Sequence, residues 1–374
     1  MRVAFLLALC TSLSTASAQA PKAGTVSADA LLSAGVSAQQ HHDLRTAIED
    51  YRKALALEPK LLEARANLGA ALAAAGDLDG AIQEDIVAVA AAPKNSALRM
   101  NLALAYYKKG DFLHASDQLM AIHAARPTDL GAAVLLGYSE IKLHKESEAL
   151  TLIEPLEAGH ESNMDLEFVL GSALIAVGRE SEGLPRLEKM ARATQAVDAY
   201  VLAGSTRLHR REFHEARADL DAALALVPNF PGANTLAGQA RDALGDTDAA
   251  VPAFQAALRE NPRDFTANLY LGTIRLKQRD FDSARPLLEL ALQLSPEVPI
   301  ARLQMAKLNG MTGKLTEAAA TLEELEKSDP RWLDPHVELA AIYYKLHRPE
   351  DGQRERNLVQ QIEAQQQQAG PPSK

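Results

Sequence analysis

Prolines recur along this sequence at a fixed spacing. In each of two groups they stand 34 residues apart: Pro59, Pro93 and Pro127, then Pro228, Pro262, Pro296 and Pro330. The interval from Pro127 to Pro228 is 101 residues, which is three periods less one residue. A period of roughly 20 to 50 residues is the signature of a repeat architecture. The chain is therefore expected to grow by stacking similar units and not to fold around one large core.

Two sets of small residues recur with the same period as the prolines, and we call each recurring set a ladder. Small residues stand at Gly35, Gly69, Ala103, Gly137, Gly171, Gly204, Gly238, Gly272, Ala306 and Ala340. A second set stands at Ala47, Ala81, Ala115, Ala149, Gly183, Ala216, Ala250, Ala284, Ala318 and Gly352. Small residues let two helices approach closely where they cross. The sequence therefore predicts units of two antiparallel helices, all-α, with small residues at the crossings.

The expected turns between paired helices are short. Ala75-Gly76-Asp77, Lys109-Gly110-Asp111 and Leu244-Gly245-Asp246 place a glycine before an aspartate. The glycine suits a left-handed backbone after the first helix, and the aspartate suits the cap of the second. A proline near the end of the unit stops the second helix before the next unit begins.

These ladders resemble tetratricopeptide repeats, and the motif is clear in Leu271-Gly272, Ala284, Leu288, Ala291 and Pro296. The resemblance implies a right-handed superhelical α-solenoid of antiparallel helix pairs. It covers residues 28–356 as nine full repeats and a degenerate tenth that begins near Leu333. Residues 351–366 are expected to form a C-terminal capping helix, 19–27 a flexible lead and 367–374 a disordered tail.

Several positions depart from the family pattern. The first aromatic residue is replaced by Arg65, Arg99, Asn234, Asn268 or Arg302, and Asp85 takes a position in the second helix that is usually apolar. Prolines also fall within expected second helices, at Pro155, Pro185, Pro252 and Pro286. Because proline removes a backbone donor, we expect the middle of the stack to be less regular than its flanks.

The N-terminus has the pattern of a secretory signal peptide. Arg2 precedes the apolar run Val3–Cys10, and Ala16-Ser17-Ala18 supplies a cleavage site of small residues. Residues 1–18 are expected to be removed, leaving Gln19 first and a periplasmic or extracellular protein. The apolar run is too short to span a bilayer, so no stable membrane insertion is expected after cleavage.

Charge and motif content exclude several functions. The net charge of −10 is unsuited to a nucleic-acid phosphate backbone. His214-Glu215 begins like a zinc-protease motif, but Ala218 stands where the second histidine is needed. His41-His42-Asp43 is a weak metal pattern in an expected turn. We therefore predict no enzymatic activity, no cofactor and no metal site.

The resemblance implies that first-helix positions line a concave groove. In repeats three to six these positions hold Met100, Leu104, Tyr107, Val134, Tyr138, Ile141, Phe168, Ile175, Val201 and Leu208. We interpret this apolar stripe as a groove for an extended or helical peptide with apolar anchors. The alternative is that such residues partly pack against their neighbours.

A ladder of arginines stands where the family has apolar residues, at Arg207, Arg241 and Arg275. The favoured interpretation is structural, with the arginine stems packed and the heads paired to acids such as Asp242 or Asp219. The alternative is an anion-binding stripe for an acidic peptide or a glycan.

The sequence thus predicts a non-enzymatic extracytoplasmic scaffold or adaptor that binds a protein or peptide partner, in envelope assembly or secretion. The alternative is a glycan-handling component of a polysaccharide export system, which rests on family analogy alone.

Overall fold

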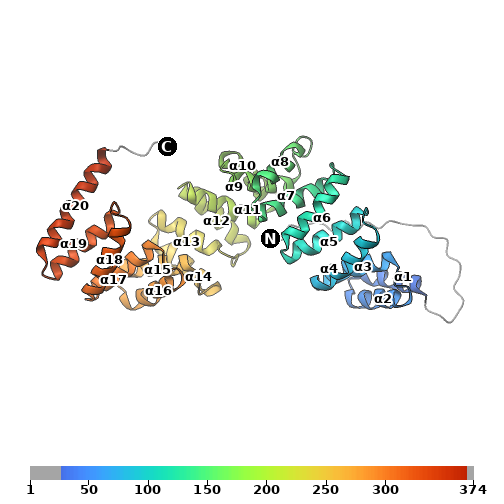
Figure 1. Cartoon of the computed structure of the whole chain (residues 1–374), viewed down its shortest axis with the longest axis horizontal. Coiled ribbons are helices and arrows are strands. Elements are labelled where there is room, and N and C mark those ends of the chain that lie inside the picture. Colours follow the sequence, from blue (N-terminus) through green and yellow to red (C-terminus); the bar gives the residue numbers. More distant parts are fainter. Residues whose placement is uncertain (1–26, 369–374) are drawn as a thin grey trace. The chain divides into compact units, whose positions relative to one another are not determined.

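The computed structural model describes residues 27–368 (Figure 1). In this range it contains 20 α-helices, one 3₁₀ turn and no strand, and successive helices pack in adjacent pairs. The all-α prediction is therefore confirmed. The predicted signal peptide, most of the lead and residues 369–374 lie outside the described range. Gln367 and Gln368, which we assigned to a disordered tail, belong to the last helix.

The chain divides into two compact units, residues 1–199 and 200–374. The first unit holds five pairs: α1 (Ala28–Gln40) with α2 (Leu44–Leu57), α3 (Leu62–Ala75) with α4 (Leu78–Ala91), α5 (Ser96–Lys109) with α6 (Phe112–Ala125), α7 (Leu130–Lys142) with α8 (Glu146–Ile153), and α9 (Met164–Ala176) with α10 (Glu180–Thr194). A 3₁₀ turn, η1 (Glu154–Leu156), follows α8.

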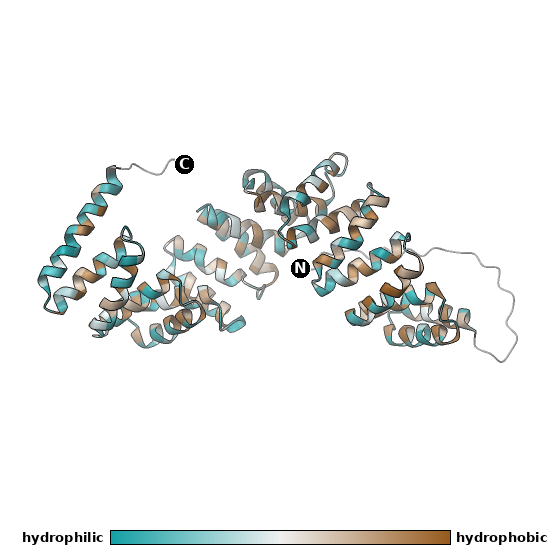
Figure 2. Ribbon diagram, viewed as in Figure 1, coloured by the Kyte–Doolittle hydropathy of each residue, from teal (hydrophilic) through white to brown (hydrophobic). Residues whose placement is uncertain are grey.

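The division between the units falls inside α11 (Val197–His209). The helices that follow in the second unit are α12 (Phe213–Leu226), α13 (Ala233–Ala243), α14 (Thr247–Glu260), α15 (Phe265–Lys277), α16 (Phe281–Leu294), α17 (Pro299–Met311), α18 (Leu315–Ser328), α19 (Leu333–Lys345) and α20 (Pro349–Gln368). The capping helix expected at 351–366 lies within α20. Figure 2 shows hydrophobic residues gathered between paired helices, whereas α20 is largely hydrophilic.

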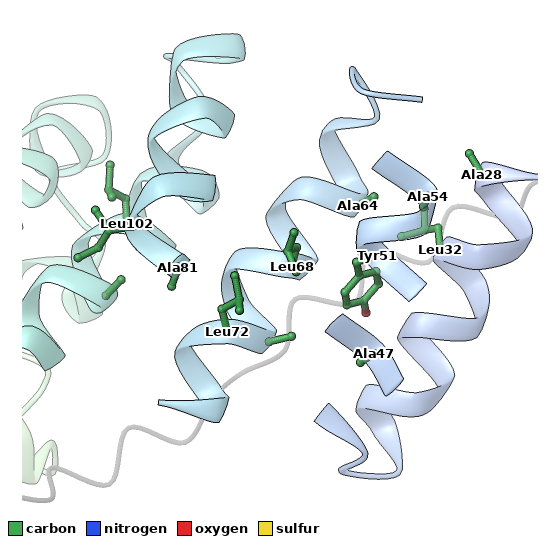
Figure 3. Packing of buried hydrophobic residues seen from close by; sticks show 13 residues of the cluster. Ala28, Leu32, Ala47, Tyr51, Ala54, Ala64, Leu68, Leu72, Ala81 and Leu102 are labelled. Carbon is green, nitrogen blue, oxygen red and sulfur yellow. The ribbon is translucent and has the colours of Figure 1, made fainter. Parts of the chain in front are cut away.

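Each pair is held by a small residue on the first helix that faces a large side chain on the second. A Cβ on Gly35 would lie 2.6 Å from the ring of Tyr51, and one on Gly238 would lie 2.5 Å from the ring of Phe254. Figure 3 shows Tyr51 between α1 and α3, beside Leu32 and Leu68. The prediction that small residues mark the helix crossings is confirmed.

The turns take the predicted conformations. Gly76 and Gly110 have φ angles of +89° and +82°, a left-handed region that glycine enters without steric cost. The side chains of Asp77 and Asp111 cap the helices that follow, accepting from the backbone of Gly80 and His114. Equivalent turns without glycine place His42 and Arg279 at φ +60°.

Prolines inside second helices have unequal effects. Pro185, Pro252 and Pro286 each stand six residues into a helix that continues unbroken. Pro155 falls later in its helix, and α8 ends at Ile153 after only eight residues, giving way to η1. The expected irregularity therefore appears at α8, where the missing backbone donor comes late enough to end the helix.

The polar residues that replace the family's first aromatic form a ladder of their own. Four of them, and His336 at the equivalent position of the tenth repeat, donate a hydrogen bond to the carbonyl oxygen of the proline six residues earlier: Arg65 to Pro59, Arg99 to Pro93, Asn234 to Pro228, Asn268 to Pro262, and His336 to Pro330. Arg302 donates to Glu324. We call the five bonds to proline carbonyls the proline-carbonyl ladder. They satisfy backbone acceptors that remain unpaired where one helix ends and the next begins.

Asp85 breaks the pattern of large apolar residues that face the small-residue ladder. Its side chain lies on α4 against Gly69 and is 1% exposed. Within the described residues, neither of its carboxylate oxygens has a hydrogen-bond partner. Burial, together with the nearby charge of Glu84, raises the pKa of Asp85 from 3.8 to about 7. The folded protein therefore favours the protonated acid.

This burial predicts a pH dependence of stability. Between about pH 4 and 7 the folded chain holds a proton on Asp85 that the unfolded chain has released, so the free energy of unfolding falls as pH rises. The full shift corresponds to roughly 4 kcal/mol. Chemical unfolding of wild type and Asp85→Asn, followed by circular dichroism at pH 5 and 8, should show that wild type loses about 2 to 4 kcal/mol relative to the variant. Asp79→Asn, at an exposed acid on the same helix, should behave as wild type. Parallel pH profiles for wild type and Asp85→Asn would contradict this account.

Candidate functional site

Four aromatic side chains from successive helices form a continuous row in the first unit. Tyr107 of α5 lies with its ring centre 5.7 Å from Phe112 of α6 and 5.4 Å from Tyr138 of α7. Tyr138 in turn stacks on Phe168 of α9 at 6.4 Å. We call these four residues the aromatic row. They come from the last turn of α5, the start of α6, the middle of α7 and the first half of α9, so the row runs across these helices and does not follow one repeated position.

The environment of the row keeps its hydroxyl groups neutral. Burial raises the pKa of Tyr107 well above 10, and the neighbouring Tyr138, which shares a hydrogen bond with it, acts in the same direction. Burial and the charge of Asp198 raise the pKa of Tyr138 to about 12. Neither hydroxyl ionises near neutral pH, so neither offers a nucleophilic oxyanion. The row offers aromatic surface instead.

A small recess opens beside the row. It measures about 10 Å³, enough for one water molecule. The residues that line it come from α5, α7 and α9: Tyr107, Val134, Leu135, Tyr138, Asp165, Phe168 and Val169. Burial raises the pKa of Asp165, and Lys142 places its ammonium group 5.3 Å from the ring centre of Tyr138. Charged groups of both signs therefore border an apolar floor.

The ten residues assigned to the groove are more deeply packed than a free surface would be. Val134, Tyr138 and Phe168 are buried, with 4%, 8% and 7% of their surface exposed. The other seven are half-buried, and Met100, Leu104 and Tyr107 pack against the core between α5, α6 and α7. Truncating Tyr138 or Phe168 must therefore affect folding, and this packing corresponds to the alternative in which such residues partly pack against their neighbours.

The ten residues are divided between the two units. Eight of them belong to the first unit, whereas Val201 and Leu208 belong to the second. Sequence reasoning also missed Phe112, which belongs to the row, and Asp165, which lines the recess beside it. Phe112 begins a second helix, and a pattern based on first-helix positions could not include it.

The arginine ladder makes internal contacts. Arg207 pairs with Asp219, as anticipated, and Arg241 pairs with Asp221 at 2.6 Å instead of Asp242. Arg275 lies 4.0 Å from Asp280 and donates to Gln278. These partners lie on the protein's own helices and turns, an arrangement that suits the structural interpretation of the ladder.

The turn histidines also have local roles. His41 contacts the carbonyl oxygen of Ser37 through Nδ1, at 2.7 Å. Asp43 accepts from the backbone of Thr46 as the cap of α2, and these hydrogen bonds hold its pKa below the usual value. The three residues thus form an ordinary helix-to-helix turn.

Within residues 27–368, no helix combines the length and the apolar character needed to cross a bilayer.

Family models described as tetratricopeptide repeat match residues 32–95, 235–299 and 275–342. Among solved structures, the chain is similar to a tetratricopeptide repeat protein from Parabacteroides merdae ATCC 43184, with 16% identity and a TM-score of 0.55 over 71% of this chain and 98% of that one. It is also similar to Pseudomonas aeruginosa pilF, with 17% identity and a TM-score of 0.50 over 55% of this chain and 94% of that one. At such identities the likeness shows the fold alone. No curated protein matches the sequence.

Proposed function

We propose that this chain, whose sequence matches tetratricopeptide repeat models over residues 32–95, 235–299 and 275–342, is a non-enzymatic scaffold whose first unit binds a protein or peptide partner along the aromatic row. The observation that carries this proposal is the continuity of the row across α5, α6, α7 and α9. A structural core does not need aromatic rings in contact from one pair to the next, since leucine and alanine fill most other crossings.

The row has the physical properties of a binding floor. Tyr138 and Phe168 are held by their neighbours, so their rotamers are fixed before a partner arrives. A partner that covers them therefore orders few additional side chains, which lowers the entropic cost of association. Large, stiff aromatic residues are also enriched among the residues that dominate binding energy.

Half-buried residues beside the row provide the area that a partner can cover. Tyr107 lies at one end, and Ile141 and Ile175 lie one helical turn beyond Tyr138 and two turns beyond Phe168. The recess is too small for a side chain, so partner anchors are expected to lie across the row and not in a deep pocket. An extended or helical peptide segment with apolar side chains suits such a surface.

A site-specific photocrosslinker tests this proposal directly. Placed at Ile141 or Ile175 in cells, it should capture a partner. The same crosslinker at Leu57 or Ile300, which are exposed apolar residues on helices that carry no member of the row, should not. With the captured partner purified, Ile141→Ala and Ile175→Ala should each weaken binding about 5- to 30-fold, which corresponds to about 1 to 2 kcal/mol.

Control variants and the salt dependence of binding complete this test. Glu324→Ala and Lys327→Ala, on a helix of the second unit, serve as matched controls and should leave affinity unchanged. Binding should persist in high salt because the proposed energy is apolar burial. Equal affinity of wild type and the folded double variant Ile141→Ala/Ile175→Ala would show that the partner binds elsewhere. A captured polysaccharide would favour the glycan-handling alternative, and release by moderate salt would favour the arginine ladder.

We also propose that the scaffold acts outside the cytoplasm, in envelope assembly or secretion. The support is the sequence pattern of Arg2, Val3–Cys10 and Ala16-Ser17-Ala18. N-terminal sequencing of protein from the periplasmic or extracellular fraction should begin at Gln19, and Ala16→Lys/Ala18→Lys should block the processing. A product that retains Met1 in the cytoplasm would rule this location out.

A further inference from the structure

Three side chains from the last three helices converge on one point in the second unit. Glu326 of α18, His336 of α19 and Glu355 of α20 each present one ligand atom, and these atoms lie within 4.8 Å of one another. The side chains of His336 and Glu355 are 2% and 1% exposed, whereas that of Glu326 is 28% exposed. We call these residues the terminal triad. They lie on three different helices, so no local sequence motif indicates the cluster.

The histidine ring is oriented by a backbone carbonyl. His336 Nε2 donates to the carbonyl oxygen of Pro330 at 3.1 Å, as a member of the proline-carbonyl ladder. A neutral ring held in this way has its lone pair on Nδ1. Nδ1 lies 2.8 Å from Glu355 Oε2 and 3.9 Å from Glu326 Oε1. With the ring in that state, the Nδ1 lone pair and two carboxylate oxygens face one another, and either a proton on Nδ1 or a metal ion must lie between them.

Other repeats supply that cation from their own side chains. Arg65 and Arg99 stand at the position equivalent to His336 and donate to Glu84 and Gln118, each 19 residues further along the chain. Glu355 likewise follows His336 by 19 residues. A guanidinium group carries enough N–H donors for the proline carbonyl and the second-helix acceptor together. A neutral imidazole ring has only one N–H, which Pro330 uses.

Glu326 adds an acid that the repeat itself does not require. The repeat places apolar residues at most equivalent positions and a histidine at one: Leu55, Val89, His123, Ala191, Leu224, Leu258 and Leu292. Glu157 is the other acidic residue at an equivalent position. The guanidinium group of Arg186 pairs with both Glu157 and Glu167. Burial and the charge of Glu355 raise the pKa of Glu326, and Glu323 acts in the same direction. The nearest cation is Arg354, which lies 3.4 Å from Glu355 Oε1, also pairs with Asp351, and is 59% exposed.

We propose that Glu326, His336 and Glu355 form a structural site for a divalent transition-metal ion, with zinc as the best-fitting ion. One imidazole nitrogen and two carboxylate oxygens are ligands that zinc accepts. Donor atoms around tetrahedral zinc lie about 3.4 Å apart, given bond lengths of about 2.0 to 2.2 Å. The two separations from Nδ1, 2.8 and 3.9 Å, bracket that value.

The partly exposed Glu326 is the side chain that adjusts, and its open side leaves the fourth position to water. The carbonyl of Pro330 acts as the outer partner that fixes the ring, as is usual for metal-bound histidine.

The site would fasten the final helix to the stack. Among residues 349–367 of α20, the buried residues are Gly352, Glu355 and Ile362, and Leu358 and Val359 are half-buried. The helix packs on α19 through these few residues and is otherwise largely hydrophilic, as the ribbon in Figure 2 shows. A metal ion that joins α18, α19 and α20 would add a second attachment, to α18.

Zinc binding to the full mature chain tests the proposal. Protein stripped with a chelator should take up one Zn²⁺ per chain in competition with a chromophoric chelator. Co²⁺ in its place should give the visible absorption bands of a four-coordinate site. Glu326→Gln and Glu355→Gln should each weaken zinc binding more than about tenfold, since even outer-shell partners of a metal contribute that much.

Hydrogen exchange gives a second reading. Zinc should slow amide exchange in α20 of wild type and leave α20 of Glu326→Gln unchanged. Glu324→Gln, on the exposed face of α18, and His42→Gln, in the turn before α2, serve as controls and should bind zinc as wild type does. Glu326→Gln decides the matter even if buried variants fail to fold, because this side chain is partly exposed. The proposal is overturned if wild type takes up no zinc, which would leave a proton as the shared cation, or if Glu326→Gln binds as tightly as wild type.

Discussion

The contact between a small residue on one helix and a large side chain on its partner is the constraint on which the rest of this structure depends. A Cβ on Gly238 would come within 2.5 Å of the Phe254 ring, and one on Gly272 within 2.9 Å of Leu288. Close approach at this point brings the two helices of a pair together over their full length. It also fixes which residues face outward, because the crossing sets the rotation of each helix about its axis.

The same constraint explains the polar ladder and its last member. Once two helices are locked in register, the fourth residue of a repeat lies near the end of the preceding repeat, and in five repeats it donates to the proline carbonyl there. Arginine and asparagine satisfy that carbonyl and still reach the next helix. Histidine at position 336 can do so only with a second proton or a metal ion. The terminal triad is therefore a consequence of the repeat geometry combined with one local change in sequence.

The pairs, turns and caps could be predicted from the sequence because each depends on residues close together in one repeat. Gly76 and Asp77 show this clearly, since their roles follow from a dipeptide. The depth of the groove residues could not be predicted in this way. Tyr138 lies on the predicted helix face, yet its burial depends on Tyr107, Phe112 and Phe168 from three other helices. The effect of a proline on its helix could not be predicted either, because the helix ends before Pro155 but continues through Pro185.

The central claim is that stability resides in these local crossings and is passed only between neighbouring pairs. Hydrogen exchange of Gly238→Ala measures this most directly, with Gly131→Ala as control, since the nearest atom to a Cβ there lies 3.7 Å away. Overpacking against Phe254 should cost about 1 to 3 kcal/mol. The account predicts faster amide exchange in α13, α14 and the helices packed against them, with α1 to α4 unchanged. Faster exchange throughout residues 27–368, or none even in α13 and α14, would contradict it.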